Sequence, residues 1–453
     1  LHERSRGSGT DKSASLQVSW VEPIGKKHKI QVLTTLDFSQ NRNVRSAYEA
    51  AGEEVRLSLP LSNEDRQERN SQQARLFLQS KWEKYEQNLG LSFERIDSRT
   101  RNFSPTAAQA RDTLPATLPT GELPEMRGDS LLSEVELDNV NFSPIFNFTW
   151  HPREDIRLAG SYNGRLTSPT PYQLRDYTDV SNPQNTVQGN PGLKPTFTHS
   201  FSLNYSSSGA QKRGYRSAAV SGNVITNQVK TVSDIDLSTG HRHTTYRNVN
   251  GNYSLSAHAN AYQPLGKQQV WGISGSANAS YRQYRTYSNG QPATLRPYSL
   301  GGNLGIRYNK DQWNLNLSGS FRYERAQAGA GTAAVRHQKD WGLTARGYAQ
   351  LPWKLYLDTD FSWTLRRGYG DGADYGRAVW NLRLTRELFQ VRLGTASLTL
   401  EGYDFLPGRL PVTRVTGDNM QHDFGNSYRE SYVLATFRFQ FQHQFGQKGG
   451  KEE

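Results

Sequence analysis

The chain has 453 residues, a formal net charge of +12, a mean hydropathy of −0.78 and 34% hydrophobic residues. It contains no cysteine, which excludes a disulfide scaffold, a thiol nucleophile and a Cys-ligated metal site. It also contains no run of about 18 apolar residues that could form a transmembrane helix. Aromatic residues make up 11% of the chain, which is more than a disordered protein carries. In strands whose successive residues face lipid and a water-filled lumen alternately, low mean hydropathy is compatible with many aromatic residues.

The first element expected in chain order is a polar stub over residues 1–11, which belongs to an upstream loop or strand. Strand alternation begins after it, where Leu16, Val18 and Trp20 alternate with serine and glutamine. From residue 12 to residue 446 we expect barrel strands, followed by a polar tail over residues 447–453. Long polar loops are expected between the strands at residues 41–70, 99–138, 169–196, 230–245 and 405–425.

The clearest alternation lies in the second half of the chain. From Tyr298 to Tyr308 the even positions are mostly apolar and the odd positions are polar or glycine, and residues 313–323 repeat the pattern. Residues 433–445 place phenylalanine at alternate positions near the end of the chain. Each segment reaches the ~9–11 residues that a tilted strand needs to cross a bilayer. The pattern predicts an all-β fold, an antiparallel transmembrane β-barrel.

Short turns alternate with the long loops along the chain, which is the arrangement of periplasmic turns and outward loops in outer-membrane barrels. Counting through these connections predicts about seventeen strands. An indole prefers the lipid–water interface, so tryptophans beside the short turns are expected to form a periplasmic aromatic girdle. The turns are expected at residues 22–27, 81–87, 151–155, 206–214, 263–267, 309–312, 351–354 and 389–392. The girdle residues are Trp20, Trp82, Trp150, Trp271, Trp313 and Trp353.

The strand count is odd, whereas single-chain bacterial barrels usually have an even number of strands with both ends in the periplasm. The first strand is expected to descend, which leaves its neighbour outside this chain. Open strand edges in hydrocarbon leave unpaired backbone groups, and each costs several kcal/mol. We therefore expect further strands upstream of Leu1, and aggregation if the chain is expressed alone.

Five segments resemble the C-terminal barrel of Bacteroidetes-type TonB-dependent receptors, the outer membrane protein β-barrel family. Residues 189–195 are similar to the family motif GNPxLKP, although Thr196 stands where the family usually has glutamate. The other four are residues 246–251, similar to an N-V-x-G strand opening, residues 402–406, similar to the last hairpin, and residues 22–26 and 263–267, similar to "EPLGK" turns. Motif residues with either a structural or a loop role are Asn190, Pro191, Leu193, Lys194 and Pro195.

The resemblance implies a barrel of about 22 strands closed around a plug. This chain would supply its C-terminal part, without the plug domain. The implied function is TonB-dependent uptake of a scarce nutrient (an iron chelate, cobalamin, a glycan or a peptide) by a multi-pass protein of the cell outer membrane. Implied partners are outer-membrane lipid and lipopolysaccharide, the TonB complex through a plug not present in this chain, and a surface lipoprotein. The alternatives are a passive porin or structural barrel without energy coupling, and a soluble β-rich binding protein.

Ligand contact is expected from the long loops at residues 99–138 and 169–196. Tyr172, Arg175 and Tyr177 are the candidates, chosen by position and residue type alone. No enzyme activity is expected, because the chain lacks Gly-x-Ser-x-Gly, His-Glu-x-x-His and a phosphate-binding glycine loop.

Three other patterns favour structural interpretations. Residues 234–240 look like a calcium loop, but the glycine falls one place late and the bidentate glutamate is missing, which favours a turn. His241 and His243 lack a third ligand, so no metal site or cofactor is expected. Lysine and arginine are spread over the whole chain rather than grouped, so nucleic acid is not an expected partner.

Overall fold

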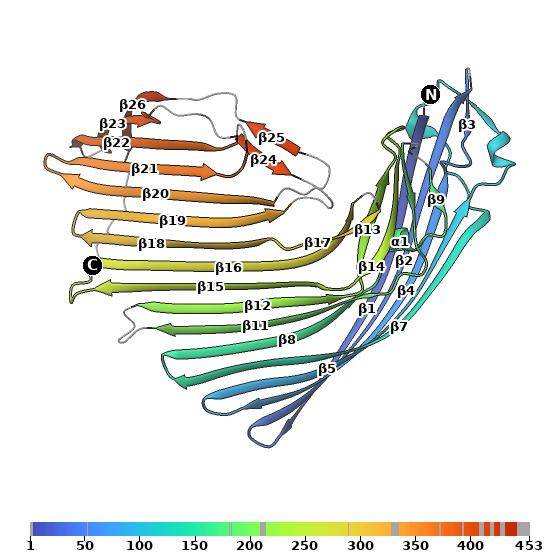
Figure 1. Cartoon of the computed structure of the whole chain (residues 1–453), viewed down its shortest axis with the longest axis horizontal. Helices are drawn as coiled ribbons and strands as arrows, with labels where there is room; N and C mark the ends of the chain where they lie inside the picture. Colours follow the sequence, from blue (N-terminus) through green and yellow to red (C-terminus); the bar gives the residue numbers. More distant parts are fainter. Residues whose placement is uncertain are drawn as a thin grey trace, which may run out of the picture.

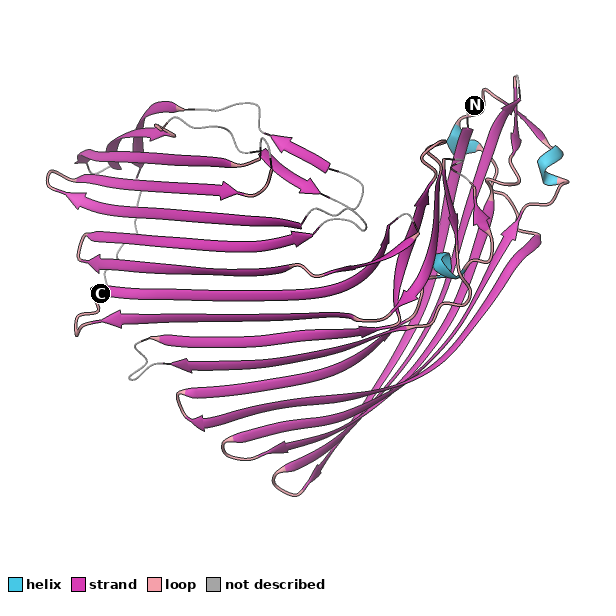
Figure 2. Cartoon of the chain, viewed as in Figure 1, coloured by secondary structure: helices cyan, strands magenta, loops and turns pink. Residues whose placement is uncertain are grey.

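The structure is a computed structural model that describes residues 3–51, 53–180, 182, 184–208, 214–288, 290–327, 335–370, 373–391, 394–406, 412–416, 421–425 and 431–441. Nearly all of this part of the chain is strand, and the few helical turns lie near one end of the sheet (Figure 2). No helix among these residues is long and apolar enough to cross a membrane.

The largest sheet has 20 strands, of which β3 (Glu54–Leu57), β6 (Thr113–Pro115) and β17 (Gln291–Leu295) are short additions. The remaining seventeen pair in chain order, each antiparallel to the one before, and form one curved sheet (Figure 1). They are β1 (Glu3–Ile24), β2 (His28–Ala51), β4 (Asn63–Lys81), β5 (Tyr85–Ser104), β7 (Ser130–Arg153), β8 (Ile156–Thr167), β11 (Thr196–Ser208), β12 (Tyr215–Thr226), β15 (Asn252–Leu265), β16 (Trp271–Ser288), β18 (Tyr298–Lys310), β19 (Trp313–Gln327), β20 (Val335–Leu351), β21 (Leu355–Arg367), β22 (Tyr375–Val391), β23 (Gly394–Tyr403) and β26 (Tyr432–Phe441). The all-β fold, its antiparallel order and the strand number are confirmed.

Smaller elements occupy the connections at the end with the long loops. A four-stranded sheet and a two-stranded hairpin lie there, together with one α-helical and two 3-10 turns. They are β9 (Thr178–Asp179), β10 (Asn185–Gln188), β13 (Gln228–Ile235), β14 (Arg242–Val249), β24 (Val412–Thr416), β25 (Gln421–Gly425), α1 (Pro171–Leu174), η1 (Gln109–Arg111) and η2 (Thr120–Glu122).

The short turns lie together at the other end of the sheet, where Figure 1 shows the hairpin tips in one row. Two of them place a glycine in the left-handed region, Gly25 at φ +68° and Gly266 at φ +74°, which a residue without Cβ adopts at no steric cost. The turns predicted at residues 206–214 and 389–392 lie partly outside the described residues. In the described part, β1 and β26 are not hydrogen-bonded to each other, so the sheet is open.

Cross-strand register sorts the side chains onto two faces, because directly opposed residues share a face. Leu304 on β18 lies opposite Gly275, and Ile306 lies opposite Ile273 and Leu317. Following the register from strand to strand gives one face, here called the apolar face, whose leucine, valine and aromatic side chains are exposed, as Leu16 is at 58%. The other, here called the polar face, carries residues such as Asn303. An exposed apolar band on a continuous sheet is suited to hydrocarbon.

The first five strands of the sheet are much longer than a bilayer requires. β1, β2, β4, β5 and β7 have 19 to 24 residues, whereas β8, β11 and β12 have 12 or 13. On the apolar face of β1, apolar residues occupy the positions from Ala14 to Ile24 except Glu22. Towards the N-terminus the same face carries Lys12, Thr10, Ser8 and Arg6. About half of each long strand therefore projects beyond the apolar band, on the side of the long loops.

These projections correct the predicted boundaries. Residues 3–11 belong to β1, so the described part of the polar stub predicted over residues 1–11 is strand and continues directly into the apolar part of β1. The loops predicted at residues 41–70 and 99–138 begin too early, because β2 continues to Ala51 and β5 to Ser104. They also end too late, because β4 begins at Asn63 and β7 at Ser130. Polar and apolar residues are mixed on both faces of these extensions, which hides the alternation. The loop predicted at residues 230–245 is largely the β13–β14 hairpin, and the predicted tail lies outside the described residues.

Candidate functional site

The segment between β8 and β11, residues 168–195, folds over the polar face of the long strands. Its α1 turn is followed by β9 and β10, and β10 pairs in parallel with β14 through Asn185, Thr186 and Val187. Because β14 continues into β15 of the main sheet, the segment is anchored at one side of the mouth. It also contacts β4, more than a hundred residues earlier in the chain.

Arg175 makes the contact with β4. Its guanidinium forms an ion pair with Asp65, an odd-numbered residue of β4 that lies on the polar face, and reaches Asp179 at 3.6 Å. Arg175 is 8% exposed, and its Cζ lies 4.5 Å from the ring centroid of Tyr172 and 5.4 Å from that of Tyr177. A buried guanidinium that is paired and stacked holds its neighbours in place.

The three sequence candidates thus meet around one guanidinium, but they differ in what they offer a ligand. The Tyr177 hydroxyl lies against the wall, where its Oη accepts a hydrogen bond from Asn63 Nδ2 at 3.1 Å. Burial raises the pKa of Tyr177 to about 12. Arg175 is occupied by Asp65. Tyr172 is half-exposed and packs edge-on to Tyr246. Ligand contact by these residues stays a prediction, and Tyr172 is the one with a free surface.

The GNPxLKP segment ties residues 168–195 to the strand-opening segment 246–251. Asn190 Nδ2 donates to the Tyr246 carbonyl at 2.9 Å, and the Lys194 amide donates to Asn248 Oδ1 at 2.7 Å. Asn248 Nδ2 donates in turn to the carbonyls of Lys194 and Asn227, at 2.8 and 2.7 Å. Leu193 is buried at 4% exposure. These contacts support a structural role for the motif residues.

Asn248→Ala is therefore expected to loosen residues 189–195 without unfolding the sheet. The change removes three hydrogen bonds at once, and we expect a local cost of about 1–3 kcal/mol. Hydrogen exchange of the amides in residues 189–195 should become about five- to a hundredfold faster. Asn278→Ala, an exposed residue on the polar face of β16, is the control. Equal exchange in the wild type and Asn248→Ala would contradict the role assigned to Asn248.

The calcium-like segment forms a self-contained turn. Asp236 accepts hydrogen bonds from the amide and the hydroxyl of Ser238, at 2.9 and 2.6 Å, and from the Thr239 hydroxyl at 2.9 Å. These hydrogen bonds lower the pKa of Asp236 to about 2. The imidazoles of His241 and His243 both lie 3.2 Å from the Thr186 hydroxyl. Turn chemistry accounts for the sequence pattern in this segment.

Ion pairs cross neighbouring strands on the polar face of the second half of the sheet. Arg346 donates to Asp360 at 2.6 Å, and Arg383 donates to Glu401 at 2.5 Å. These residues line a hollow of about 380 Å³ over β19 to β23. The arginine charge on this part of the wall is thus balanced by carboxylates of the wall itself.

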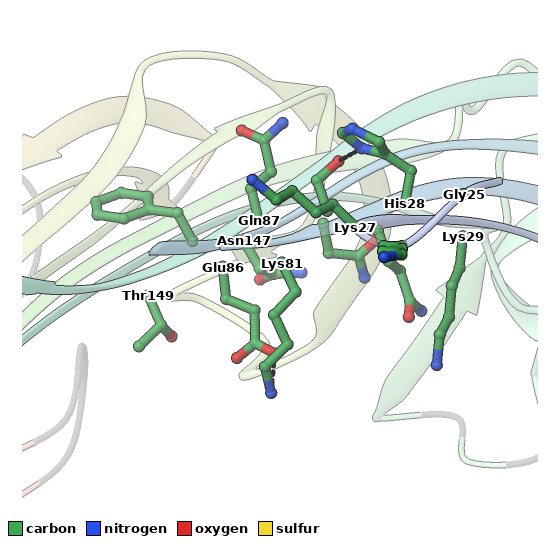
Figure 3. A pocket seen from close by; sticks show the side chains of 14 residues that line it. Gly25, Lys27, His28, Lys29, Lys81, Glu86, Gln87, Asn147 and Thr149 are labelled. Atoms are coloured by element: carbon green, nitrogen blue, oxygen red, sulfur yellow. Dashed lines mark hydrogen bonds and ion pairs between the residues drawn. The ribbon is translucent and has the colours of Figure 1, made fainter. Parts of the chain in front are cut away.

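A larger hollow of about 550 Å³ lies at the end of the sheet with the short turns. Figure 3 shows Lys29, Lys81 and Glu86 on one side of the strands and His28 on the other, as the register requires. Lys81 pairs with Glu86 at 3.2 Å, while His28 Nδ1 lies 2.9 Å from the Ser80 hydroxyl. Four lysines and one carboxylate line this hollow, so it is cationic.

The six predicted girdle tryptophans all lie at this same end. Four are on the apolar face of a strand next to a turn, and the other two, Trp82 and Trp353, are in turns. Trp82 packs against His28 and Tyr85, with ring centroids 5.6 Å apart in both cases. The structure brings the six together at one level, and their girdle function stays a prediction.

The opposite face of the long strands is covered by residues 105–129. Buried Val44, Tyr48 and Leu57 pack there with Leu123 and Met126 in a small core that the sequence did not reveal. The even-numbered residues of β2 share the apolar face, so this segment lies on the outer side of the wall, while residues 168–195 lie on the inner side. The projecting strands are thus covered on both faces.

Glu64 fixes residues 105–129 to the wall. Its side chain is 0% exposed and accepts hydrogen bonds from Arg66 Nε at 2.5 Å, Arg42 Nε at 2.7 Å and the Gly128 amide at 3.0 Å. Burial opposes ionisation, but the hydrogen bonds from Arg66 and Arg42 outweigh it and keep the pKa of Glu64 below its usual range. A lowered carboxyl pKa contributes stability above the ordinary carboxyl pKa, and this contribution is lost as the pH falls through the lowered value.

Acidification below the ordinary carboxyl pKa should therefore release residues 105–129. Because trypsin does not work in acid, release is measured with pepsin as cleavage within this segment of the detergent-solubilised protein. Glu64→Gln should be cleaved readily at every pH at which pepsin is active, since it lacks the charge that binds the two arginines. Glu136→Gln, a change of an exposed carboxylate on the same face, is the control. Cleavage that depends on pH in the same way in all three proteins would contradict the role of Glu64.

The open curved sheet, its exposed apolar face, its ion-paired polar face and its division into short turns and long loops define a transmembrane β-barrel wall. The model of the outer membrane protein beta-barrel family matches residues 2–297, and the chain belongs to that family. It is an outer-membrane protein that crosses the membrane many times with its strands.

Solved structures that resemble the chain have low sequence identity to it. The copper transporter OprC is 13% identical, with 83% of this chain and 60% of that chain covered and a TM-score of 0.37. The RagAB peptide importer in the "open-open" state is 10% identical, with 89% and 58% covered and a TM-score of 0.38. BauA, the ferric preacinetobactin receptor from Acinetobacter baumannii, is 10% identical, with 95% and 63% covered and a TM-score of 0.38. The chain thus spans about 60% of the length of these structures, and no curated protein matches it.

Proposed function

We propose that this chain forms most of the barrel wall of an outer-membrane receptor that imports a scarce nutrient with energy from TonB. The observation that carries the proposal is the fold of residues 168–195 across the polar face, held by the buried Arg175–Asp65 pair. A passive porin keeps an aqueous channel open. A loop fixed inside the mouth favours capture of a ligand over free diffusion.

The two open edges of the sheet require hydrogen-bond partners from the rest of the receptor. Unpaired backbone groups of β1 and β26 would cost several kcal/mol each in hydrocarbon. We propose that polypeptide beyond the described residues closes the barrel and supplies a plug, which would contact the ion-paired polar face. TonB would act on that plug, and a surface lipoprotein could cover the mouth from outside.

Planar-bilayer conductance of the protein purified from its native outer membrane tests whether the barrel is plugged. We expect no steady conductance, and channels that open when moderate urea unfolds the plug. Steady open channels without urea would overturn the proposal in favour of a passive porin, because an unplugged barrel of this size conducts ions.

Energy coupling needs a separate test in native cells. A strain that lacks this protein and a strain that lacks TonB are grown with an iron chelate, cobalamin, a glycan or a peptide as the limiting nutrient. We expect both strains to fail on the same nutrient. Failure of the first strain alone would contradict TonB coupling.

A further inference from the structure

A cavity of about 320 Å³ lies below α1, on the inner side of the mouth. One wall is the polar face of the β4, β5 and β7 projections, with Arg69, Ile96 and Ser98 among its residues. The other wall is the end of β8 and the segment that leads into α1, with Arg165, Ser168 and Leu174. Residues that are about a hundred positions apart in the sequence thus enclose one space.

The cavity carries two positive charges and no negative one. Arg69 and Arg165 line it, and its lining contains neither aspartate nor glutamate. Both arginines are exposed, and no carboxylate of the described residues forms an ion pair with either. This distinguishes them from Arg346 and Arg383, which are paired within the wall. A guanidinium without a protein partner presents a fork of donors that matches a carboxylate or a phosphate.

The rest of the lining combines hydroxyls with an apolar floor. Ile96 and Leu174 are buried at 2% and 4% exposure, whereas Val135 and Leu137 of β7 are half-buried and present apolar surface to the cavity. The Ser168 Oγ is buried and has no hydrogen-bond partner. Small-molecule sites are typically mostly apolar, with a few polar groups and a volume of about 300–1,000 Å³. The cavity meets this description at its lower limit of size.

We propose that this cavity binds a small organic anion, whose carboxylate or phosphate lies between Arg69 and Arg165 and whose apolar part rests on Val135 and Leu137. The inference names a ligand class for the receptor and rests on the proposed function only for the direction of transport. Binding itself requires neither a plug nor TonB, so it can be tested apart from uptake.

Isothermal titration calorimetry of the detergent-solubilised native protein tests the proposal with three probes: hexanoate, hexyl phosphate and hexanol. We expect one or both anions to bind and hexanol to bind far more weakly. Hexanoate alone would identify a carboxylate ligand, and hexyl phosphate alone would identify a phosphate ligand. Equal binding of hexanol, or no binding of either anion, would overturn the proposal.

Substitutions locate the site. Arg69→Gln and Arg165→Gln should each raise the Kd of the bound anion at least about tenfold, because a charge-assisted pair is lost. Arg307→Gln, at an exposed arginine on the polar face of β18, is the matched control and should leave the Kd unchanged. Both arginines are exposed, so their loss should not affect folding. An equal change in all three variants would show that the whole lumen attracts anions and would overturn the assignment to this cavity.

Discussion

Leu304→Arg should sharply reduce the amount of folded protein in the outer membrane. Leu304 lies at the middle of β18 on the apolar face, is 72% exposed and faces two glycines, Gly275 and Gly319, on the neighbouring strands. An arginine on the lipid face near the bilayer midplane costs about 2–4 kcal/mol. In lipid vesicles, urea unfolding of the purified variant should begin at clearly lower urea than that of the wild type.

The adjacent residue provides the matched control. Asn303 is on the polar face of the same strand, opposite Ser276 and Ser320, so Asn303→Arg adds the same charge to a wet surface. It should be nearly neutral for stability and abundance. If Asn303→Arg is as harmful as Leu304→Arg, or if neither has an effect, the assignment of the two faces is wrong.

The barrel wall could be predicted from the sequence because the alternation of apolar and polar residues is a local pattern. Period-two alternation in residues 298–308 and 313–323 predicts strands, and the register then places all of their apolar residues on one face. Turn residues mark the ends of the strands; Gly25 and Gly266, for example, adopt a positive φ in their turns. These signals need no knowledge of distant contacts, and they predicted the strand number and order.

The projecting parts of the long strands could not be predicted from the sequence, for a physical reason. In residues 3–11 of β1, both faces carry only charged residues, serine, threonine or glycine, so apolar and polar residues do not alternate. The strand conformation there depends on hydrogen bonds to β2 and on residues 105–129, which supply the apolar cover through Leu123 and Met126. Such tertiary cover overrides the local pattern.

The mouth site depends on contacts that no local pattern contains. Arg175 and Asp65 are 110 residues apart, and the Asn190 and Asn248 hydrogen-bond partners are separated by more than 50 residues. The sequence did indicate Tyr172, Arg175 and Tyr177 as a group of interest. It could not indicate that Arg175 forms an ion pair with Asp65 of the wall. Nor could it indicate that Arg69 and Arg165 are the arginines available to a ligand.

Arg175→Ala should release residues 168–180 from the wall while leaving the barrel folded. Removing one partner of a buried pair costs about 3–5 kcal/mol, and the partial exposure of Asp65 places this pair at the lower end. A local cost of about 3 kcal/mol corresponds to roughly a hundredfold larger open population. Hydrogen exchange of residues 170–180, followed by mass spectrometry in detergent, should accelerate by about that factor, while β18 amides remain unchanged.

Two further variants separate the ion pair from other effects of the substitution. Arg175→Lys keeps the charge but loses the planar fork and the stacking on Tyr172 and Tyr177, so it should give an intermediate acceleration. Arg69→Ala removes an exposed arginine of the same wall and should leave exchange in residues 170–180 unchanged. If Arg175→Lys exchanges as slowly as the wild type, charge alone holds the segment. If Arg175→Ala does so as well, β10 and the Asn190 and Asn248 hydrogen bonds suffice, and the arginine is then available to contact a ligand.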